Sequence, residues 1–250
     1  MNRILPLALL AACSAALAAA DVTALLRTAD SYRAGADRLQ VETLVQTFGR
    51  DGSADKERRY TVFVQPERKS LVLMRSPAEA GQKVLMLGDD FWLLLPGSQR
   101  PVRITPSQKL LGDASTGDIA TMSWSQDYAG TLVGEEPCPG AEAAAARAPC
   151  LHLSLQSQRK GVSYARIELW LGQPRHEPVA ADLYVQSDKL AKRARFVLDK
   201  AAPRQVAEMV LQDELSHHKQ TRVRYLSRQP REVPEAWLNP MFLARNPALD

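Results

Sequence analysis

The residues of this chain that could perform chemistry are few and widely separated. No GxSxG, HExxH, GxxxxGK[ST] or GxGxxG motif occurs, so the patterns of common hydrolases, metalloproteases and nucleotide-binding enzymes are missing. His217 and His218 are adjacent, and on a strand they would face opposite ways and could not share a metal ion. His152 and His176 have no cysteine or carboxylate at ligand spacing. The sequence therefore predicts no catalytic residue, no metal site and no cofactor.

The paired and motif-borne carboxylates also favour structural interpretations. Asp89-Asp90 lies in a predicted hairpin turn, where aspartate side chains commonly hydrogen-bond to nearby backbone. Glu135-Glu136 could repel each other and share a proton, but a solvated strand end is the commoner explanation. Asp118, within Gly-Asp-Ile, is expected to cap a short helix or tie a loop. We assign no enzyme.

The N-terminus is typical of a secretory signal peptide. Met1-Asn2-Arg3 precedes an apolar run over residues 4–17 and the small residues Ala18-Ala19-Ala20. We expect cleavage before Asp21, which leaves 250 − 20 = 230 residues. Leu10-Ala11-Ala12-Cys13 resembles a bacterial lipobox, so a lipoprotein anchored through Cys13 is the alternative. The leading prediction is a periplasmic protein.

Cys138 and Cys150 are the cysteines of the mature chain, and an even pair in an oxidising compartment favours a disulfide. Both flanking segments look like strands, so the bond would close the base of a hairpin loop. By loop-entropy reasoning it should contribute about 3 kcal/mol at most. The spacing excludes a Cys-x-x-Cys redox pair. Two unpaired buried thiols are the alternative.

The composition is that of a globular protein, with 45% apolar and 24% charged residues. The formal net charge of +4 falls to +3 without Arg3, and so small a bias does not favour nucleic-acid binding. No linker or internal repeat is visible, so we expect a single domain over residues 21–250. Within it, residues 21–36 have helical spacing, with Asp21 able to cap the start and Gly35 placed to end the helix.

The rest of the chain predicts about twelve antiparallel strands joined mostly by short turns. They cover residues 39–48, 58–65, 70–75, 83–87, 91–95, 131–135, 151–156, 164–171, 179–186, 190–199, 205–213 and 220–226. Such a large sheet must curl, because open twisted sheets of more than about ten strands rarely stay flat. Either helices fill the concave side or the sheet encloses a cavity.

The stretch over residues 84–128 organises this sheet. Its two apolar runs, 84–87 and 91–95, flank Gly88-Asp89-Asp90 and lack polar alternation, which predicts a hairpin covered on both faces. The following polar, Gly-rich passage still carries Ile119, Met122 and Trp124, so it should lie on the sheet rather than act as a linker. Gly112 and Gly117 are the candidate hinge or lid residues.

Five short motifs occur in this part of the chain in a characteristic order: WLLLP, SQKLLG, GDI, WSQDY and a Glu-Glu close behind. In this order they resemble the outer-membrane lipoprotein-sorting family, relatives of the periplasmic carrier LolA. The resemblance runs from about Ala24 to Leu226. It implies a mostly β protein, a curved antiparallel half-barrel with helices plugging the open side and an apolar cavity for acyl chains. For the lid-holding arginine of the carrier, Arg59 and Arg103 are both possible.

The candidate cavity residues are large apolar side chains of the central passage and the strands. They are Val62, Val64, Leu71, Leu73, Leu85, Leu87, Trp92, Leu94, Trp124, Trp170 and Phe196. Burial of one methylene contributes about 0.8 kcal/mol, so a tail of about 14 methylenes offers roughly 11 kcal/mol before entropy is subtracted. For each single residue, ordinary core packing is the alternative.

Two further segments could carry contacts with partners. Along residues 189–196, Arg193 and Arg195 face one side of the predicted strand while Lys192 faces the other with apolar neighbours. The basic side could dock anionic head groups or an acidic protein, and a merely solvated face is the alternative. Residues 230–244 predict an extended arm with a short apolar helix, pinned by Trp237, Met241, Phe242 and Leu243.

The leading functional hypothesis is an exported carrier that binds lipid acyl chains or an acylated lipoprotein. It would transfer this cargo across the periplasm towards the outer membrane, with a membrane-protein export partner, transient membrane contact and no nucleic acid. The alternatives are a lipid-sensing regulatory module and a non-catalytic accessory subunit of an envelope transporter.

Overall fold

The computed structural model describes residues 11–121, 123–140, 149–201, 204–213 and 220–245, with side chains from residue 22 onward. Several sequence predictions lie outside this part of the chain. They concern the start of the signal peptide, the side chain of Cys13, Met122 and the pair His217-His218.

Thirteen strands form one antiparallel sheet in the order β6-β5-β4-β3-β2-β1-β15-β14-β13-β12-β11-β10-β9. Their bounds are β1 (Leu39–Phe48), β2 (Ala54–Gln65), β3 (Lys69–Met74), β4 (Lys83–Leu87), β5 (Asp90–Leu94), β6 (Val102–Ile104), β9 (Tyr128–Pro137), β10 (Pro149–Ser157), β11 (Arg166–Gly172), β12 (Pro178–Tyr184), β13 (Leu190–Leu198), β14 (Val206–Gln212) and β15 (Gln220–Pro230). All twelve predicted strands are present. The strands that sequence reasoning missed are β6, β7 (Lys109–Leu111) and β8 (Ala114–Ser115), which are too short to show a pattern.

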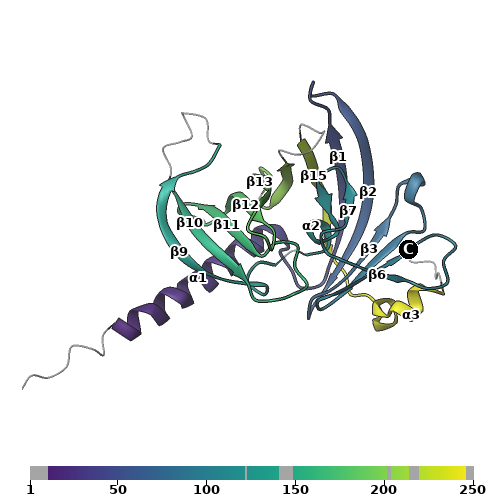
Figure 1. Cartoon of the computed structure of the whole chain (residues 1–250), viewed down its shortest axis with the longest axis horizontal. Helices are drawn as coiled ribbons and strands as arrows, with labels where there is room; N and C mark the ends of the chain where they lie inside the picture. The colour runs from purple at the N-terminus through teal and green to yellow at the C-terminus, as the bar shows by residue number, and fades with distance from the viewer. Residues whose placement is uncertain (1–10, 122, 141–148, 202–203, 214–219, 246–250) are drawn as a thin grey trace, which may run out of the picture.

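The sheet consists of two meanders joined where β1 pairs with β15, from Leu39 opposite Pro230 to Phe48 opposite Gln220. It stays open, because β6 and β9 end the strand order without pairing to each other. Figure 1 shows the resulting half-barrel as two walls, β1 to β6 on one side and β9 to β13 on the other. The predicted curved antiparallel half-barrel with plugging helices is confirmed.

Two helices cover the concave face: α1 (Ala11–Arg33) and α2 (Thr116–Ala120), which lies between the two walls (Figure 1). Val22, Leu26 and Ala29 of α1 are buried in one apolar cluster with the concave side chains of the strands. The predicted start of this helix is wrong for the full chain, because α1 begins at Ala11 and Asp21 lies inside it. Its end is as predicted, since Gly35 adopts a φ of +78°, which glycine tolerates best.

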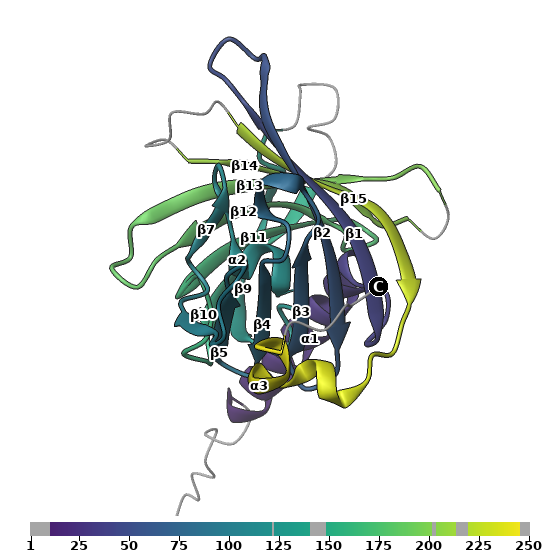
Figure 2. The ribbon, with the colours of Figure 1, turned by 90° about the vertical axis from the view of Figure 1, so that its right-hand side faces the viewer.

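The C-terminal arm, which follows β15, covers the convex face of β2 to β5. A further short helix, η1 (Pro77–Glu79), lies between β3 and β4. The arm contains η2 (Glu235–Leu238) and α3 (Pro240–Leu243), and Figure 2 shows it in front of β3 and β4. Val233, Leu238 and Leu243 are buried there. The predicted pinning role of Met241 is wrong, because this side chain is 68% exposed.

The central hairpin is covered on both faces, as its unbroken apolar runs predicted. In β4, Val84 and Met86 belong to the concave cluster, whereas Leu85 packs under the C-terminal arm. Successive side chains of a strand point to opposite faces, so a run of apolar residues serves two cores at once.

The disulfide between Cys138 and Cys150 is present, with 5.1 Å between the two Cα atoms. It joins the end of β9 to the start of β10 and therefore closes the base of the hairpin loop, as predicted. Cys150 packs on the convex side with Trp170 and Ala180.

Candidate functional site

The plug segment, defined as residues 113–127, of which Met122 lies outside the described part of the chain, occupies the concave side of the half-barrel and includes α2. Ile119, Ala120 and Trp124 anchor it in the concave apolar cluster. Trp124 packs edge-on against Phe196 with ring centroids 5.6 Å apart, and the Arg33 guanidinium lies 4.0 Å over the Trp124 ring. The same guanidinium donates to the Thr121 carbonyl at 3.3 Å. The segment is therefore a fitted cover rather than a linker.

A buried ion pair fastens the middle of the plug segment to β13. Asp118 Oδ2 accepts from Lys192 Nζ at 2.7 Å and from the Ser115 backbone at 2.8 Å, while Asp118 Oδ1 accepts from Tyr164 Oη at 2.7 Å. Burial alone would raise the pKa of Asp118, but the Lys192 ammonium and these hydrogen bonds hold that pKa below its ordinary value. Asp118 thus ties the start of α2, as its motif predicted.

A second polar contact fastens the end of the plug segment to the turn before β3. Arg68 ion-pairs with Asp127 and also donates to the Gly161 carbonyl at 3.0 Å. Burial raises the pKa of Asp127 more than the Arg68 guanidinium lowers it. The second oxygen of Asp127, Oδ2, is buried and accepts no hydrogen bond from the described residues.

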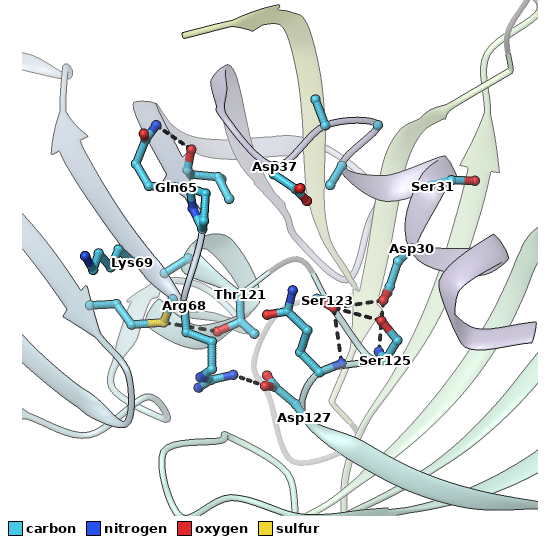
Figure 3. Close-up of a pocket in the computed structure, with 18 of the residues that line it drawn as sticks. Asp30, Ser31, Asp37, Gln65, Arg68, Lys69, Thr121, Ser123, Ser125 and Asp127 are labelled. Atoms are coloured by element: carbon cyan, nitrogen blue, oxygen red, sulfur yellow. Dashed lines mark hydrogen bonds and ion pairs between the residues drawn. The ribbon is translucent and has the colours of Figure 1, made fainter. Parts of the chain in front are cut away.

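A third contact fastens the plug segment to α1. The Asp30 carboxylate accepts from the Trp124 backbone at 2.7 Å, from the Ser125 backbone at 2.9 Å and from the Ser123 hydroxyl at 2.9 Å. Figure 3 shows Asp30, Ser123 and Ser125 converging, with Arg68 and Asp127 nearby. The plug segment is therefore held by carboxylates at its middle and near its end.

Two cavities adjoin the plug segment. The polar cleft, of about 510 Å³, opens between α1, the turn before β3 and a part of the plug segment that includes Thr121, Ser123 and Asp127. The apolar chamber, of about 50 Å³, lies beneath the plug segment and is lined by side chains that include Trp124, Phe196 and Met209. Ligand pockets usually measure about 300–1,000 Å³, so the cleft is of ligand size and the chamber is not.

The structure divides the predicted cavity residues between the two faces of the sheet. Trp124 and Phe196 line the chamber, Val64 lines the cleft, and Val62 is buried in the concave cluster. The others lie on the convex face: Leu71, Leu73, Leu85, Leu87, Trp92 and Leu94 under the C-terminal arm, and Trp170 beside the disulfide. Contact with lipid stays a prediction for all of them.

Gly112 precedes α2 and Gly117 lies within it, and both positions are tightly packed. A Cβ on Gly112 would lie 2.4 Å from Thr47, and one on Gly117 would lie 2.1 Å from the Ser163 hydroxyl. Gly112 also has a φ of +55°, which strains other residues. Close packing thus accounts for both glycines, and the hinge role stays a prediction.

Sequence reasoning missed the buried cations that contact the plug segment. Arg59 and Arg103 are exposed, whereas Arg33, Arg68 and Lys192 are buried. The signal for Lys192 was present, because it shares a strand face with Ala194 and Phe196, which predicts an inward-facing charge. Arg68 showed no such signal, since its partners come from distant parts of the chain.

His152 has two carboxylate neighbours that its sequence spacing did not predict. Strand pairing brings Glu168 Oε2 to 2.9 Å and Glu136 Oε1 to 3.3 Å from its ring nitrogens, and the ring stacks on Trp170 at 4.6 Å. Glu136 lies near the end of β9 with its side chain 43% exposed, so the interpretation as a solvated strand end stands, although one oxygen contacts His152. Among the described residues, no group of three or more His, Cys, Asp or Glu side chains could hold a metal ion.

No helix within the described ranges combines the length and apolar character needed to span a membrane. On β13, Arg193 and Arg195 are exposed and Lys192 is buried, which confirms the predicted alternation of this strand.

Comparisons with known proteins agree with this geometry. Residues 66–245 match a family model described as "Uncharacterized protein". No curated protein matches the sequence. Among solved structures, a LolA superfamily protein from Nitrosomonas europaea is 26% identical, covers 86% of this chain and 96% of its own, and has a TM-score of 0.76.

Two more distant structures show the fold alone. A candidate outer membrane lipoprotein-sorting protein domain from Vibrio parahaemolyticus is 15% identical, with coverage of 89% of this chain and 98% of its own and a TM-score of 0.68. A DUF1329 family protein from Desulfovibrio piger is 19% identical, with coverage of 89% and 97% and a TM-score of 0.67.

Proposed function

This chain belongs to the family matched over residues 66–245 and is LolA-like, and from this premise we propose that it is an exported, non-catalytic carrier. It holds the acyl chains of a lipid or of an acylated lipoprotein on the concave face of the half-barrel. It transfers them across the periplasm towards the outer membrane. We infer that residues 21–250 form the mature domain and that a membrane-protein partner loads it.

The observation that carries this proposal is the plug segment, which covers an apolar concave face but is fastened to it by buried polar bonds. The apolar chamber of about 50 Å³ is far below the roughly 300–1,000 Å³ of ordinary ligand pockets. An acyl chain therefore needs the plug segment to move away. Side chains that the plug covers, such as Phe196 and Met209, would then contact the chain.

The magnitudes support such an exchange. A tail of about 14 methylenes contributes roughly 11 kcal/mol on burial before entropy is subtracted. Removing one partner of a buried ion pair costs about 3–5 kcal/mol, and separating Asp118 from Lys192 costs less if water reaches both. Ligand binding can thus compensate for opening the plug segment, whereas without a ligand the closed form is favoured.

The small chamber also favours a second candidate function. A non-catalytic accessory subunit of an envelope transporter would keep its concave face filled by its own side chains. The two functions differ in whether a lipid ever occupies the interior, and this can be measured directly.

The test uses two matched alanines on neighbouring strands. Ala194 lines the chamber, whereas Ala180 is equally buried on the convex face. Each is replaced by leucine. Overpacking should lower the stability of both variants by a similar amount, about 1–3 kcal/mol, so a difference in binding reports the position and not the stability. Binding of a fluorescent C16 fatty acid is measured by titration. The protein is also purified without detergent, and native mass spectrometry detects any lipid that remains bound.

The carrier proposal predicts bound lipid in the wild type, at least tenfold weaker binding in Ala194→Leu and unchanged binding in Ala180→Leu. An empty protein that binds no fatty acid would contradict it and favour the accessory function. Equal losses in both variants would show that binding does not depend on the concave interior, which also contradicts the proposal.

A further inference from the structure

The polar cleft and the apolar chamber are parts of one path. Among the described residues, Thr121, Ser123 and Asp127 line both of them, so the two spaces adjoin at this part of the plug segment. A molecule that enters the chamber when the plug segment moves must keep its other end in the cleft. The path therefore fits an amphiphile with an apolar tail and a polar end.

Asp127, which lines both spaces, carries a buried acceptor without a partner among the described residues. Its side chain is fully buried, and one oxygen is used by Arg68. The other oxygen, Oδ2, accepts nothing from the described residues, and a buried acceptor without a donor is destabilising. A ligand with an N–H or O–H group would remove this destabilisation.

The charges of the cleft are balanced. Its lining has three cations, Arg27, Arg68 and Lys69, and three anions, Asp30, Asp37 and Asp127, so the formal sum is 3 − 3 = 0. Arg68, Lys69, Asp30 and Asp127 are engaged with other parts of the protein.

Arg27 and Asp37 remain available at the rim. Both side chains are exposed, and neither has an ion pair or hydrogen bond within the described ranges, although both line the cleft. Figure 3 shows Asp37 on the side of the cleft facing Gln65 and Thr121. The cleft thus offers one cation and one anion to a ligand, in addition to the Asp127 acceptor.

We propose that the polar cleft binds the zwitterionic head group of a phospholipid that carries a primary ammonium, with the tail directed into the apolar chamber. The ammonium donates to Asp127 Oδ2 and lies near Asp37, while the phosphate lies near Arg27. This assignment rests on the proposed carrier function and adds the class of polar end that the carrier recognises.

The test compares lysophospholipids with one identical tail and three head groups, each below its micelle concentration. Phosphoethanolamine has an ammonium with N–H donors, phosphocholine has a cation without them, and phosphoglycerol has hydroxyl donors without a cation. We expect the phosphoethanolamine form to bind at least tenfold more tightly than either of the others. Tailless glycerophosphoethanolamine should bind at least a hundredfold more weakly.

The double variant Arg27→Gln/Asp37→Asn should reduce the preference for phosphoethanolamine to threefold or less. The matched control is Arg193→Gln/Asp182→Asn, which removes an ion pair of 3.7 Å between the exposed Arg193 and the half-buried Asp182 on the convex face and should keep the preference.

Equal binding of the three lysophospholipids would overturn the head-group assignment while leaving the carrier function intact. Equal binding of glycerophosphoethanolamine and its lysolipid would overturn it too and assign the cleft to a soluble zwitterion. If no lysophospholipid binds and Ala194→Leu changes nothing, the carrier function itself fails.

Discussion

The two covers of this sheet are attached in different ways. On the concave face, the plug segment is fastened by carboxylates, namely Asp30, Asp118 and Asp127, each with partners on another element. On the convex face, the C-terminal arm is held mainly by apolar side chains such as Leu238 and Leu243. Both covers bury large apolar residues, but the carboxylates that fasten the plug segment are buried or nearly so, whereas the ion pair of the arm, Lys69 with Glu235, leaves Glu235 79% exposed.

This difference suggests different roles for the two covers. Hydrogen bonds and ion pairs contribute little net energy, because water offers equivalent partners when they open. Apolar contacts have no such replacement, and removing them costs the full transfer energy plus that of the cavity. We therefore expect the plug segment to open without global unfolding and the C-terminal arm to remain in place.

The largest effect should come from Lys192→Met. This substitution leaves the Asp118 carboxylate buried without its cation, which typically costs about 3–5 kcal/mol. Urea unfolding of both proteins measures the loss. Arg193→Met on the outward side of the same strand is the control and should change stability by less than about 0.5 kcal/mol. A loss below about 1 kcal/mol for Lys192→Met would show that the ion pair does not hold the plug segment.

Leu243→Ala should destabilise the protein by about 2–5 kcal/mol, because Leu243 is fully buried under the C-terminal arm. The affinity for the fluorescent fatty acid should stay within twofold of wild type at a temperature where the variant is folded. Met241→Ala, two residues away and 68% exposed, is the control for stability. A large loss of affinity in Leu243→Ala would assign the ligand to the convex face instead.

A smaller effect is expected for Asp30→Ala, which removes the acceptor of two backbone N–H groups. The loss of stability should be about 1–3 kcal/mol. Amide hydrogen exchange should accelerate at Trp124 and Ser125, while the arm around Leu238 keeps its protection. Asp37→Ala, at an exposed position of the same cleft, serves as the control. Faster exchange throughout the chain would mean that the plug segment opens only when the protein unfolds.

The smallest effects should appear in the pH dependence of stability, because the pKa values of two aspartates of the plug segment are shifted in opposite directions. The pKa of Asp127 is raised in the folded state, so its contribution to stability grows as the pH falls towards the ordinary value of 3.8. The pKa of Asp118 is lowered, so its contribution is present above 3.8 and is lost as the pH falls through the folded pKa.

Differences between wild type and variants isolate these two contributions. Asp127→Asn should reduce the gain of stability that occurs as the pH falls towards 3.8. Asp118→Asn should reduce the loss of stability that occurs as the pH falls further below 3.8. Unfolding free energies measured over this range check both signs. Identical slopes in wild type and Asp118→Asn would contradict the charged state assigned to Asp118.

Local patterns of the sequence predicted the elements but not their assembly. The bounds of β1 and β4, the end of α1 and the disulfide follow from residue types and nearest neighbours. The pairing of β1 with β15 joins residues that are 220 − 48 = 172 to 230 − 39 = 191 positions apart, and no local pattern specifies it.

The same limit explains the division of the predicted cavity residues. An unbroken apolar strand such as β4 is buried on both faces, so its sequence cannot say which side chain faces the concave side. Leu85 and Leu94 were grouped with Val62 for this reason, although they lie under the arm. A charge on an apolar strand face, as at Lys192, was the better pointer to the site.

Hydrogen–deuterium exchange of the wild type with and without a saturating C16 lysophospholipid tests the central claim most directly. We predict that residues 113–127 exchange faster when the ligand is bound, because it displaces them from the concave face, while residues 233–244 keep the same rate. Unchanged exchange in the plug segment, together with altered exchange in the C-terminal arm, would contradict this account.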